Sequence, residues 1–193
     1  IYEPGGVEIP KFDGSFLDYL LNETERVHSK AGRYEDPKEH SFFDNLPGPI
    51  VNREPVEEPI ENSDTDLNPK IKEVYIESVP NICEEGDDGD YGSSAVRDIK
   101  CLQDISKRVH FGEYVAEAKF QKKEEIYTEL ISRNDEEGLV DELKNKEVEE
   151  RVINRVKEKG ERYGVDSKFI GEFYRDKIMP LTIEAEVKYF LNR

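Results

Sequence analysis

The stretch SSAVRDIKCLQDISKRVHFGEYVAEAKFQKKEEIYTELISR, residues 93–133, carries the longest helical pattern in the sequence. Its apolar residues recur at three- and four-residue spacing, which is typical of a helix that buries one side. Ser93 is predicted to cap its N-terminus. Gly112 costs about 1 kcal/mol relative to alanine inside a helix and indicates the close approach of another helix. The apolar stripe consists of Ala95, Ile99, Leu102, Ile105, Val109 and Ala116.

Similar patterns predict helices over most of the remaining chain. Ser15 is a predicted cap for the first of them, and Pro180 is expected to kink the last. No convincing alternating strand pattern occurs, so the sequence predicts an all-α fold, a bundle of antiparallel helices in a single domain over 1–193. The further predicted helices cover residues 15–34, about 69–82, 135–145, 146–163 and 167–193.

Between these helices lies an acidic, proline-rich stretch at residues 44–69. Five prolines argue against a helix there. Long loops are often functional or disordered, but a solvated connector is the interpretation that we favour. A second acidic loop, rich in glycine, is predicted at 84–91.

Composition excludes several classes of function. With 28 basic and 45 acidic residues the net charge is −17, which argues against a nucleic-acid binder and against an anionic membrane surface as partner. No apolar run reaches the roughly 18 residues that a membrane span needs. Cys83 and Cys101 cannot form a disulfide framework, and a reduced intracellular, cytoplasmic protein is the simplest expectation.

Motifs for covalent catalysis, metals and cofactors are absent from the sequence. His28, His40 and His110 lack metal-ligand spacing, and GDDGDYG at 86–92 does not match a calcium-binding loop. There is no nucleophile elbow, phosphate-binding loop or dinucleotide fingerprint. We therefore predict neither a metal site nor a cofactor.

Two cations share one side of the long helical pattern. Arg108 and Lys119 are eleven residues apart, about three turns, so they point the same way. Such a pair in an acidic protein could bind an anionic ligand. Salt bridges to neighbouring helices are the alternative explanation, and on spacing alone we favour that alternative.

Two further polar pairs have four-residue spacing: Asn145 with Glu149, and Thr182 with Glu186. Each could present a hydrogen-bonding group and a carboxylate on one helix face. Asn145 could instead cap the helix that follows it, and Glu186 could belong to a solvated face. Thr182 could restore hydrogen bonding that Pro180 removes.

Residues 92–121, GSSAVRDIKCLQDISKRVHFGEYVAEAKFQ, closely resemble the signature helix of the eukaryotic, all-helical chorismate mutases. The resemblance extends through 8–43, 145–165 and 178–193 in the same order, and 44–69 is least alike. It implies rearrangement of chorismate to prephenate on the route to phenylalanine and tyrosine. This pericyclic reaction needs no nucleophile, metal or cofactor. Catalysis then comes from holding the folded substrate and from donors at the breaking ether bond.

The resemblance also implies roles for individual residues. Arg108 in SKRVHFG matches a residue that binds a substrate carboxylate, and Lys119 in AEAKF one that donates to the ether oxygen and a neighbouring carboxylate. Glu149 in NKEVEE would accept from the substrate hydroxyl. Glu186 in PLTIEAE would have to be protonated to donate, and burial near other acids raises a carboxyl pKa in that direction. The implied substrate site consists of Arg108, Lys119, Asn145, Glu149, Thr182 and Glu186.

A regulatory site and a homodimer are implied as well. The family binds aromatic amino acids, such as tyrosine and tryptophan, at its dimer interface. Gly92 and Ser93 match its amide-donating turn, for which an ordinary helix cap is the alternative. Arg33 in AGRYEDP matches an effector-binding arginine, whereas Gly32 stands where some relatives have a second arginine. Val96 replaces a threonine linked to effector response in fungal relatives.

Two departures from the family pattern shape our expectations. The family begins with a helix, bearing a second carboxylate-binding arginine, that precedes the segment matching 8–14. This sequence has almost nothing there and begins at Ile1 rather than methionine, so we expect a truncated sequence. The loop after 163–166 is shorter than in fungal relatives. A catalytically inactive, mutase-like binding protein is the alternative function, and a plastid is the alternative to the cytoplasm.

Overall fold

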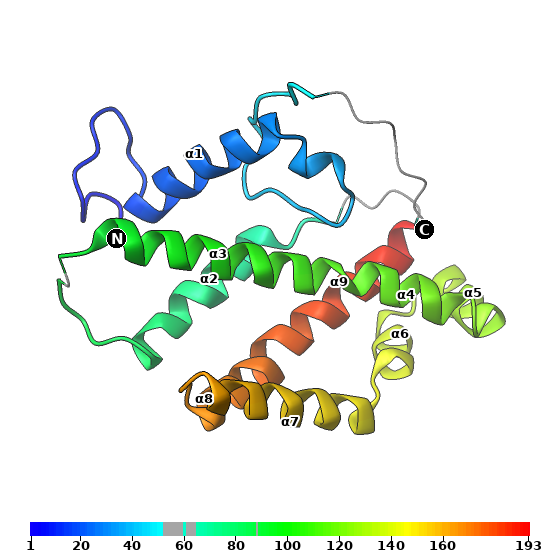
Figure 1. Cartoon of the computed structure of the whole chain (residues 1–193). Helices are drawn as coiled ribbons and strands as arrows, with labels where there is room; N and C mark the ends of the chain where they lie inside the picture. Colours follow the sequence, from blue (N-terminus) through cyan, green and yellow to red (C-terminus); the bar gives the residue numbers. More distant parts are fainter. Residues whose placement is uncertain (52–59, 61–64, 88) are drawn as a thin grey trace. The chain divides into compact units, whose positions relative to one another are not determined.

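The structure, a computed structural model, describes residues 1–51, 60, 65–87 and 89–193. Every regular element in these residues is a helix (Figure 1), which confirms the predicted all-α class. None of the helices in the described residues is both long and apolar enough to cross a membrane. Much of the predicted loop at 44–69 lies outside the described residues.

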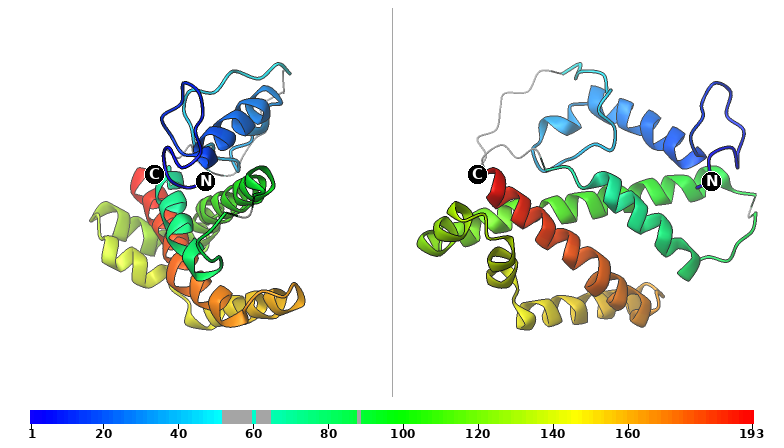
Figure 2. Two further views of the ribbon diagram at one scale, coloured as in Figure 1. Left: turned by 90° about the vertical axis from the view of Figure 1, so that its left-hand side faces the viewer. Right: turned by 180° about the vertical axis from the view of Figure 1, so that it is seen from behind.

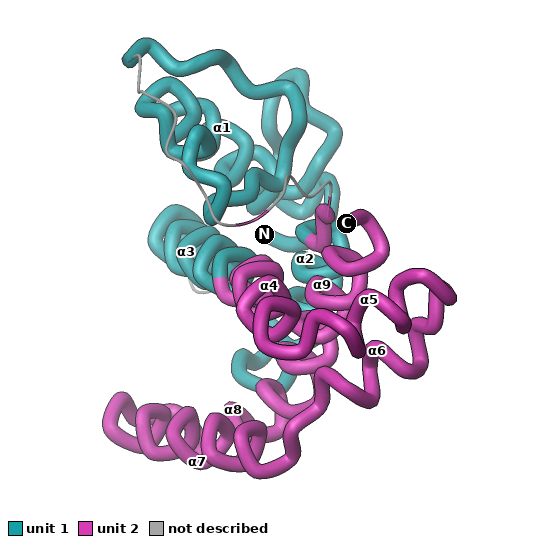
Figure 3. Tube along the Cα trace, turned by 90° about the vertical axis from the view of Figure 1, so that its right-hand side faces the viewer, with its two compact units in different colours: residues 1–57, 68–107 teal, residues 58–67, 108–193 magenta. Residues whose placement is uncertain are grey.

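The chain divides into two compact units (Figure 3). The first comprises residues 1–57 and 68–107, and the second comprises residues 58–67 and 108–193. Each unit is described below by itself.

The first unit contains α1 (Phe16–Lys30), α2 (Asn68–Ser78) and α3 (Tyr91–His110) as far as residue 107. Ser15 begins α1 with a capping box. Its hydroxyl accepts from the backbone N–H of Asp18 at 3.0 Å, and its own N–H donates to the Asp18 carboxylate at 3.3 Å. This confirms the predicted cap, a local feature worth about 1 kcal/mol.

The predicted start of the long helix is wrong by one half turn. The helix α3 begins at Tyr91, and the backbone N–H of Ser94 donates to the carbonyl of Asp90 at 3.1 Å. Ser93 therefore lies within the first turn rather than at the cap. The predicted continuous helix over 93–133 is also interrupted, because the chain turns at 121–123.

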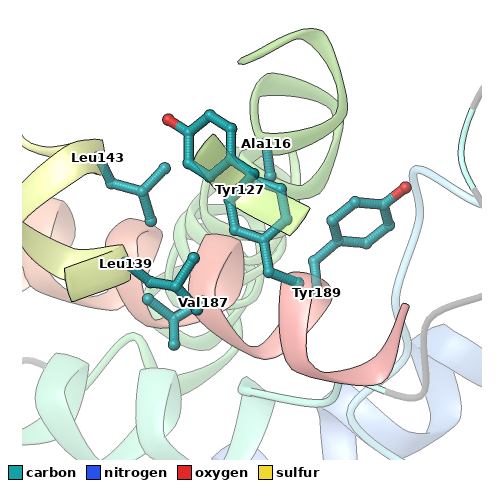
Figure 4. Packing of buried hydrophobic residues seen from close by; sticks show 7 residues of the cluster. Ala116, Tyr127, Leu139, Leu143, Val187 and Tyr189 are labelled. Carbon is teal, nitrogen blue, oxygen red and sulfur yellow. The ribbon is translucent and has the colours of Figure 1, made fainter. Parts of the chain in front are cut away.

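The second unit contains the part of the 93–133 helical pattern that follows residue 107, and all of the helices after it. Its first three helices pack with the last one around a core that includes Ala116, Tyr127, Leu139, Val187 and Tyr189 (Figure 4). The rings of Tyr127 and Phe190 stack with their centroids 4.7 Å apart. The two remaining helices pack against each other (Figure 2). The six helices are α4 (Gly112–Phe120), α5 (Glu124–Ser132), α6 (Glu136–Leu143), α7 (Lys146–Arg162), α8 (Ser167–Phe173) and α9 (Met179–Asn192).

Gly112 allows α4 and α9 to approach closely, as the sequence predicted. A Cβ atom added at Gly112 would lie 2.9 Å from the carbonyl oxygen of Thr182 and 3.3 Å from Cγ of Glu186. Real Cβ atoms essentially never approach a backbone oxygen so closely. The missing side chain thus brings the polar face of α9 against α4.

Pro180 changes the last predicted helix in an unexpected way. The chain is helical from Ser167 to Asn192, as predicted, but α8 and α9 are joined by a π-helical turn, Tyr174–Ile178, in which Met179 N–H donates to the carbonyl of Tyr174. Proline lacks an N–H, and its ring clashes with the carbonyl four residues earlier in an α-helix. A wider turn immediately before Pro180 relieves that conflict.

Candidate active site

Lys119 and Glu186 form an ion pair inside the second unit. The ammonium Nζ of Lys119 on α4 donates to Oε2 of Glu186 on α9 at 2.7 Å. It also donates to the carbonyl oxygen of Leu143, the last residue of α6, at 3.1 Å. The Glu186 side chain is 6% exposed and that of Lys119 is 33% exposed. One lysine therefore joins three helices and leaves part of its surface open to a ligand.

The environment of Glu186 shifts its ionisation equilibrium toward the protonated form. Burial raises the pKa of this carboxyl, and the positive charges of Lys119 and Arg108 oppose the rise only in part, so that the net shift is upward. A neutral carboxylic acid can donate a hydrogen bond, which a carboxylate cannot. Glu186 is thus suited to serve as a donor as well as an ion-pair partner.

Arg108 contributes positive charge to the same place. Its charge acts on Glu186, and its side chain is half-buried at the end of α3. Among the described residues, no ion pair or side-chain hydrogen bond of Arg108 is seen. The salt-bridge alternative therefore describes Lys119, which pairs with Glu186, but not Arg108, whose donors remain available.

Thr182 lies one turn before Glu186 on α9 and is buried. Its hydroxyl donates to the carbonyl of Ile178 at 2.8 Å, which matches the alternative that it satisfies hydrogen bonding near Pro180. Its carbonyl oxygen faces Gly112. The structure thus brings Thr182, Glu186 and Lys119 to one side of the contact between α4 and α9.

Asn145 and Glu149 are occupied in capping α7. Asn145 is exposed; its side-chain oxygen accepts from the N–H of Val148 at 3.1 Å, and its own N–H donates to Glu149 Oε1 at 3.1 Å. This is the helix-cap alternative. Because Lys119 holds the carbonyl of Leu143, two residues before Asn145, the start of α7 lies within about 7 Å of chain from that contact. The pair is adjacent to the cluster, with its side chains turned to the cap.

Two features of the cluster were missed by sequence reasoning. The Leu143 carbonyl is a backbone acceptor, which no residue type reveals. Tyr127 is a buried core residue, and burial raises its pKa to about 12, with the charges of Glu142 and Glu186 adding to the rise. Its phenol stays neutral near the cluster at ordinary pH.

In the first unit, the predicted effector residue Arg33 already has internal partners. Its Nε and Nη2 donate to Glu39 Oε2 at 2.9 and 2.7 Å, and Nη1 donates to Gln103 Oε1 at 2.7 Å. Gly92 and Ser93 are exposed in the first turn of α3. Gln103 is eleven residues further along α3, about 16 Å away. One chain therefore does not bring Arg33 and Gly92 together.

No group of three or more histidine, cysteine, aspartate or glutamate side chains is arranged to hold a metal ion in the part of the chain that the structure describes. The polar side chains of the second unit instead combine free cationic donors with a buried, protonatable carboxyl. The described residues thus form an all-helical protein with a candidate site for an anionic ligand, where donors from α3 and α4 lie near a carboxyl of α9.

Comparison with known proteins identifies the family to which this chain belongs. Residues 91–187 match the family described as chorismate mutase type II. The chorismate mutase of Saccharomyces cerevisiae is 41% identical over 213 residues, covering 100% of this chain and 83% of the yeast protein. The chain belongs to the type II chorismate mutase family.

Solved structures agree with this assignment. The crystal structure of AtCM1 with tyrosine bound in its allosteric site is 38% identical, with a TM-score of 0.93, and covers 100% of this chain and 83% of that one. The Aro7p chorismate mutase of Candida albicans, in complex with L-tryptophan, is 37% identical with a TM-score of 0.94, over 100% and 79% of the two chains.

Proposed function

We propose that the chorismate mutase activity of this chain resides in the cluster formed by Arg108, Lys119 and Glu186, with the start of α7 as a further wall. Chorismate mutases are isomerases that rearrange chorismate to prephenate, on the route to phenylalanine and tyrosine. The observation that carries the placement is the partly exposed Lys119 side chain, whose ammonium is held between Glu186 and the Leu143 carbonyl. The 193 residues would act as one mutase domain.

The chemistry needs position and charge rather than a covalent intermediate. Chorismate is a dicarboxylate, and the unpaired guanidinium of Arg108 offers a planar fork for one carboxylate. Lys119 would donate to the ether oxygen, on which negative charge grows as the bond breaks. Holding the folded conformer removes most of the entropic cost of reaching the transition state.

Glu186, Thr182, Asn145 and Glu149 would complete the substrate site. A protonated Glu186 would donate to the ether oxygen from the side opposite to solvent, and its raised pKa supports that role. Activity would then fall as pH rises through the pKa of Glu186, because the ionised carboxylate no longer donates. Asn145 and Glu149 would exchange part of their capping bonds for bonds to the ring side of the substrate.

The alternative, an inactive mutase-like binding protein, is not favoured. All six polar positions of the implied site are present, and the cations retain donors for a ligand.

The test is the loss of chorismate with detection of prephenate, for the wild type and Arg108→Ala. We expect the substitution to lower kcat/KM by about 10²- to 10³-fold, the loss typical for one donor of a charge-stabilising site. Arg133→Ala is the matched control, because Arg133 is exposed and, among the described residues, pairs only with Glu129 of the helix that it follows. An Arg108→Ala variant as active as the control would move the active site elsewhere.

Regulation by an aromatic amino acid is a further part of the proposal. A homodimer would be required if Arg33 of one chain and the Gly92–Ser93 turn of another chain share an effector, since one chain does not bring them together. The tyrosine and tryptophan bound in the structures of the relatives support these ligands as effectors. The cytoplasm is the proposed compartment, with a plastid as the alternative.

A further inference from the structure

Four side chains form a hydrogen-bonded network where the end of α9 meets α4, with Glu117 and Tyr189 buried at its centre and Gln121 and Arg193 at its exposed edge. Tyr189 donates from its hydroxyl to Glu117 Oε2 at 2.6 Å, and Arg193 forms an ion pair with the same oxygen. Arg193 Nη1 also donates to the Tyr189 hydroxyl at 3.0 Å, and Gln121 Nε2 donates to Glu117 Oε1 at 3.2 Å. We call these residues, Glu117, Gln121, Tyr189 and Arg193, the Glu117 network.

Burial makes this network costly to disturb. The Glu117 side chain is 8% exposed, and Tyr189 is buried. The Arg193 guanidinium lies over the Phe120 ring, 4.0 Å from its centroid. A buried carboxylate must keep its donors, because an unpaired buried charge is strongly unfavourable. The network therefore admits essentially one arrangement of the two helices at this end.

The centre of the network lies on the same two helices, α4 and α9, as the ion pair of Lys119 and Glu186. Glu117 precedes Lys119 by two residues on α4, and Tyr189 follows Glu186 by three residues on α9. At the other end of the contact, Gly112 meets Thr182. The α4–α9 contact is thus fixed by a close backbone approach at one end, beside Glu186, and by the Glu117 network at the other, two residues from Lys119.

The apolar contacts between these fixed points cannot set the separation of Lys119 and Glu186 as sharply. The core around Ala116 and Phe190 is held by dispersion and burial, which are not directional. Hydrogen bonds weaken steeply with distance and angle. A displacement of about 1 Å in a catalytic group can cost on the order of 100-fold in rate.

We propose that Glu117 is a positioning residue, which acts through Tyr189 and Arg193 to set the separation of Lys119 from Glu186. This inference rests on the proposed function for its catalytic consequence. Glu117 itself does not touch the substrate.

The experiment compares Tyr189→Phe and Glu117→Gln with Asp166→Ala. The first variant removes only a hydroxyl, and the second neutralises the carboxylate while keeping its shape. Asp166 caps α8 by accepting from the N–H groups of Lys168 and Phe169, so its loss destabilises the second unit without touching the network. All three are assayed well below their unfolding temperatures. We expect kcat to fall by about 10- to 100-fold in the two network variants, with little change in KM, and to be unchanged in Asp166→Ala.

A second readout is independent of turnover: the titration of the Glu186 carboxyl carbon by NMR. Lys119 holds the pKa of Glu186 down against burial, so a loosened contact should raise that pKa further in both network variants and not in the control. Variants that lose thermal stability like Asp166→Ala, with wild-type kcat and Glu186 titration, would overturn the proposal. If the wild type has no mutase activity, the proposed function fails, and the titration alone decides the positioning role.

Discussion

Glu186 in the second unit and Glu39 in the first are each influenced by two cationic side chains, yet their pKa values move in opposite directions. Glu186 is acted on by Lys119 and Arg108, and burial still raises its pKa. Burial also opposes ionisation of Glu39, but hydrogen bonds from Lys107 and Arg33 outweigh it and lower the pKa. Glu186 is the more deeply buried of the two, at 6% exposed against 14% for Glu39, and it receives fewer direct charge-assisted hydrogen bonds, so burial dominates its shift whereas the hydrogen bonds dominate that of Glu39.

This difference separates two kinds of site. Glu186 receives one direct hydrogen bond from a cation, Lys119. Its raised pKa allows the carboxyl to gain a proton more readily than an ordinary glutamate. Glu39 receives bonds from two cations and remains an anion that fills the guanidinium fork of Arg33. An effector carboxylate that takes the place of Glu39 on Arg33 would have to break these bonds, whereas under the proposed function the substrate would meet a Lys119 side chain that is already partly exposed.

The largest effect should follow from Lys119→Met, which keeps the length of the side chain and removes its charge. We expect kcat to fall by about 10²- to 10³-fold, because the donor at the ether oxygen is lost. The pKa of Glu186 should rise further, since its closest cation is gone. Steady-state kinetics against Lys144→Met, an exposed neighbour, checks this. Retention of wild-type kcat in Lys119→Met would contradict a catalytic role for the Lys119–Glu186 pair and leave no functional difference between Glu186 and Glu39.

Glu25 sharpens the comparison because it is in the first unit but is fully buried. Both of its carboxyl oxygens accept from the N–H of Phe42, at 3.1 and 2.9 Å, and burial raises its pKa from 4.5 to about 7. The folded state therefore binds the proton more tightly than the unfolded state. Its contribution to stability is complete below pH 4.5 and is lost as pH rises through about 7.

We accordingly expect the wild type to lose about 3 kcal/mol of unfolding free energy between pH 4.5 and 8 relative to Glu25→Gln. The glutamine cannot ionise and still accepts from Phe42. Denaturant unfolding across this pH range measures the difference, with Glu23→Gln, an exposed change on the same helix, as control. Parallel stability curves for the wild type and Glu25→Gln would show that burial does not govern this carboxyl.

The smallest effect is expected for Glu39→Gln. The ion pairs of Glu39 involve partly exposed partners, so their loss should cost about 1 kcal/mol or less at low ionic strength. That cost should shrink as salt is added. Denaturant unfolding at several salt concentrations, with Glu35→Gln as control, tests this. A cost that is several times larger and independent of salt would show that Glu39 behaves as a deeply buried carboxyl, like Glu186 and Glu25.

Local features of the fold were predictable because local residues cause them. Ser15 and Asp18 cap α1 through their own side chains, and Gly112 permits a contact that only a missing Cβ allows. The turn at 121–123 was not predictable, because Gln-Lys-Lys is compatible with a helix. Packing sets the turn instead, since α5 must bury Tyr127 against Phe190.

Spacing within each helix predicted the individual polar residues of the candidate site, but not which of them come together. Spacing predicted that Lys119 and Glu186 each lie on the polar face of a helix. They are 67 residues apart in the sequence, so only the family resemblance predicted that they belong to one site. The Leu143 carbonyl carries no signal in the residue type. Pairing of Arg33 with Glu39 and Gln103 likewise depends on contacts between separate segments, which a pattern within one helix cannot reveal.

The π-helical turn at Tyr174–Ile178 has a consequence for how the length of this chain can vary. Each residue of an α-helix rotates the chain by about 100°, so one extra residue in a turn resets the angular phase of everything that follows. Thr182, Glu186 and Tyr189 face α4 only in the phase that this turn provides. Substitutions within the turn leave that phase intact, whereas a single deletion there would rotate a different side of α9 toward its partner.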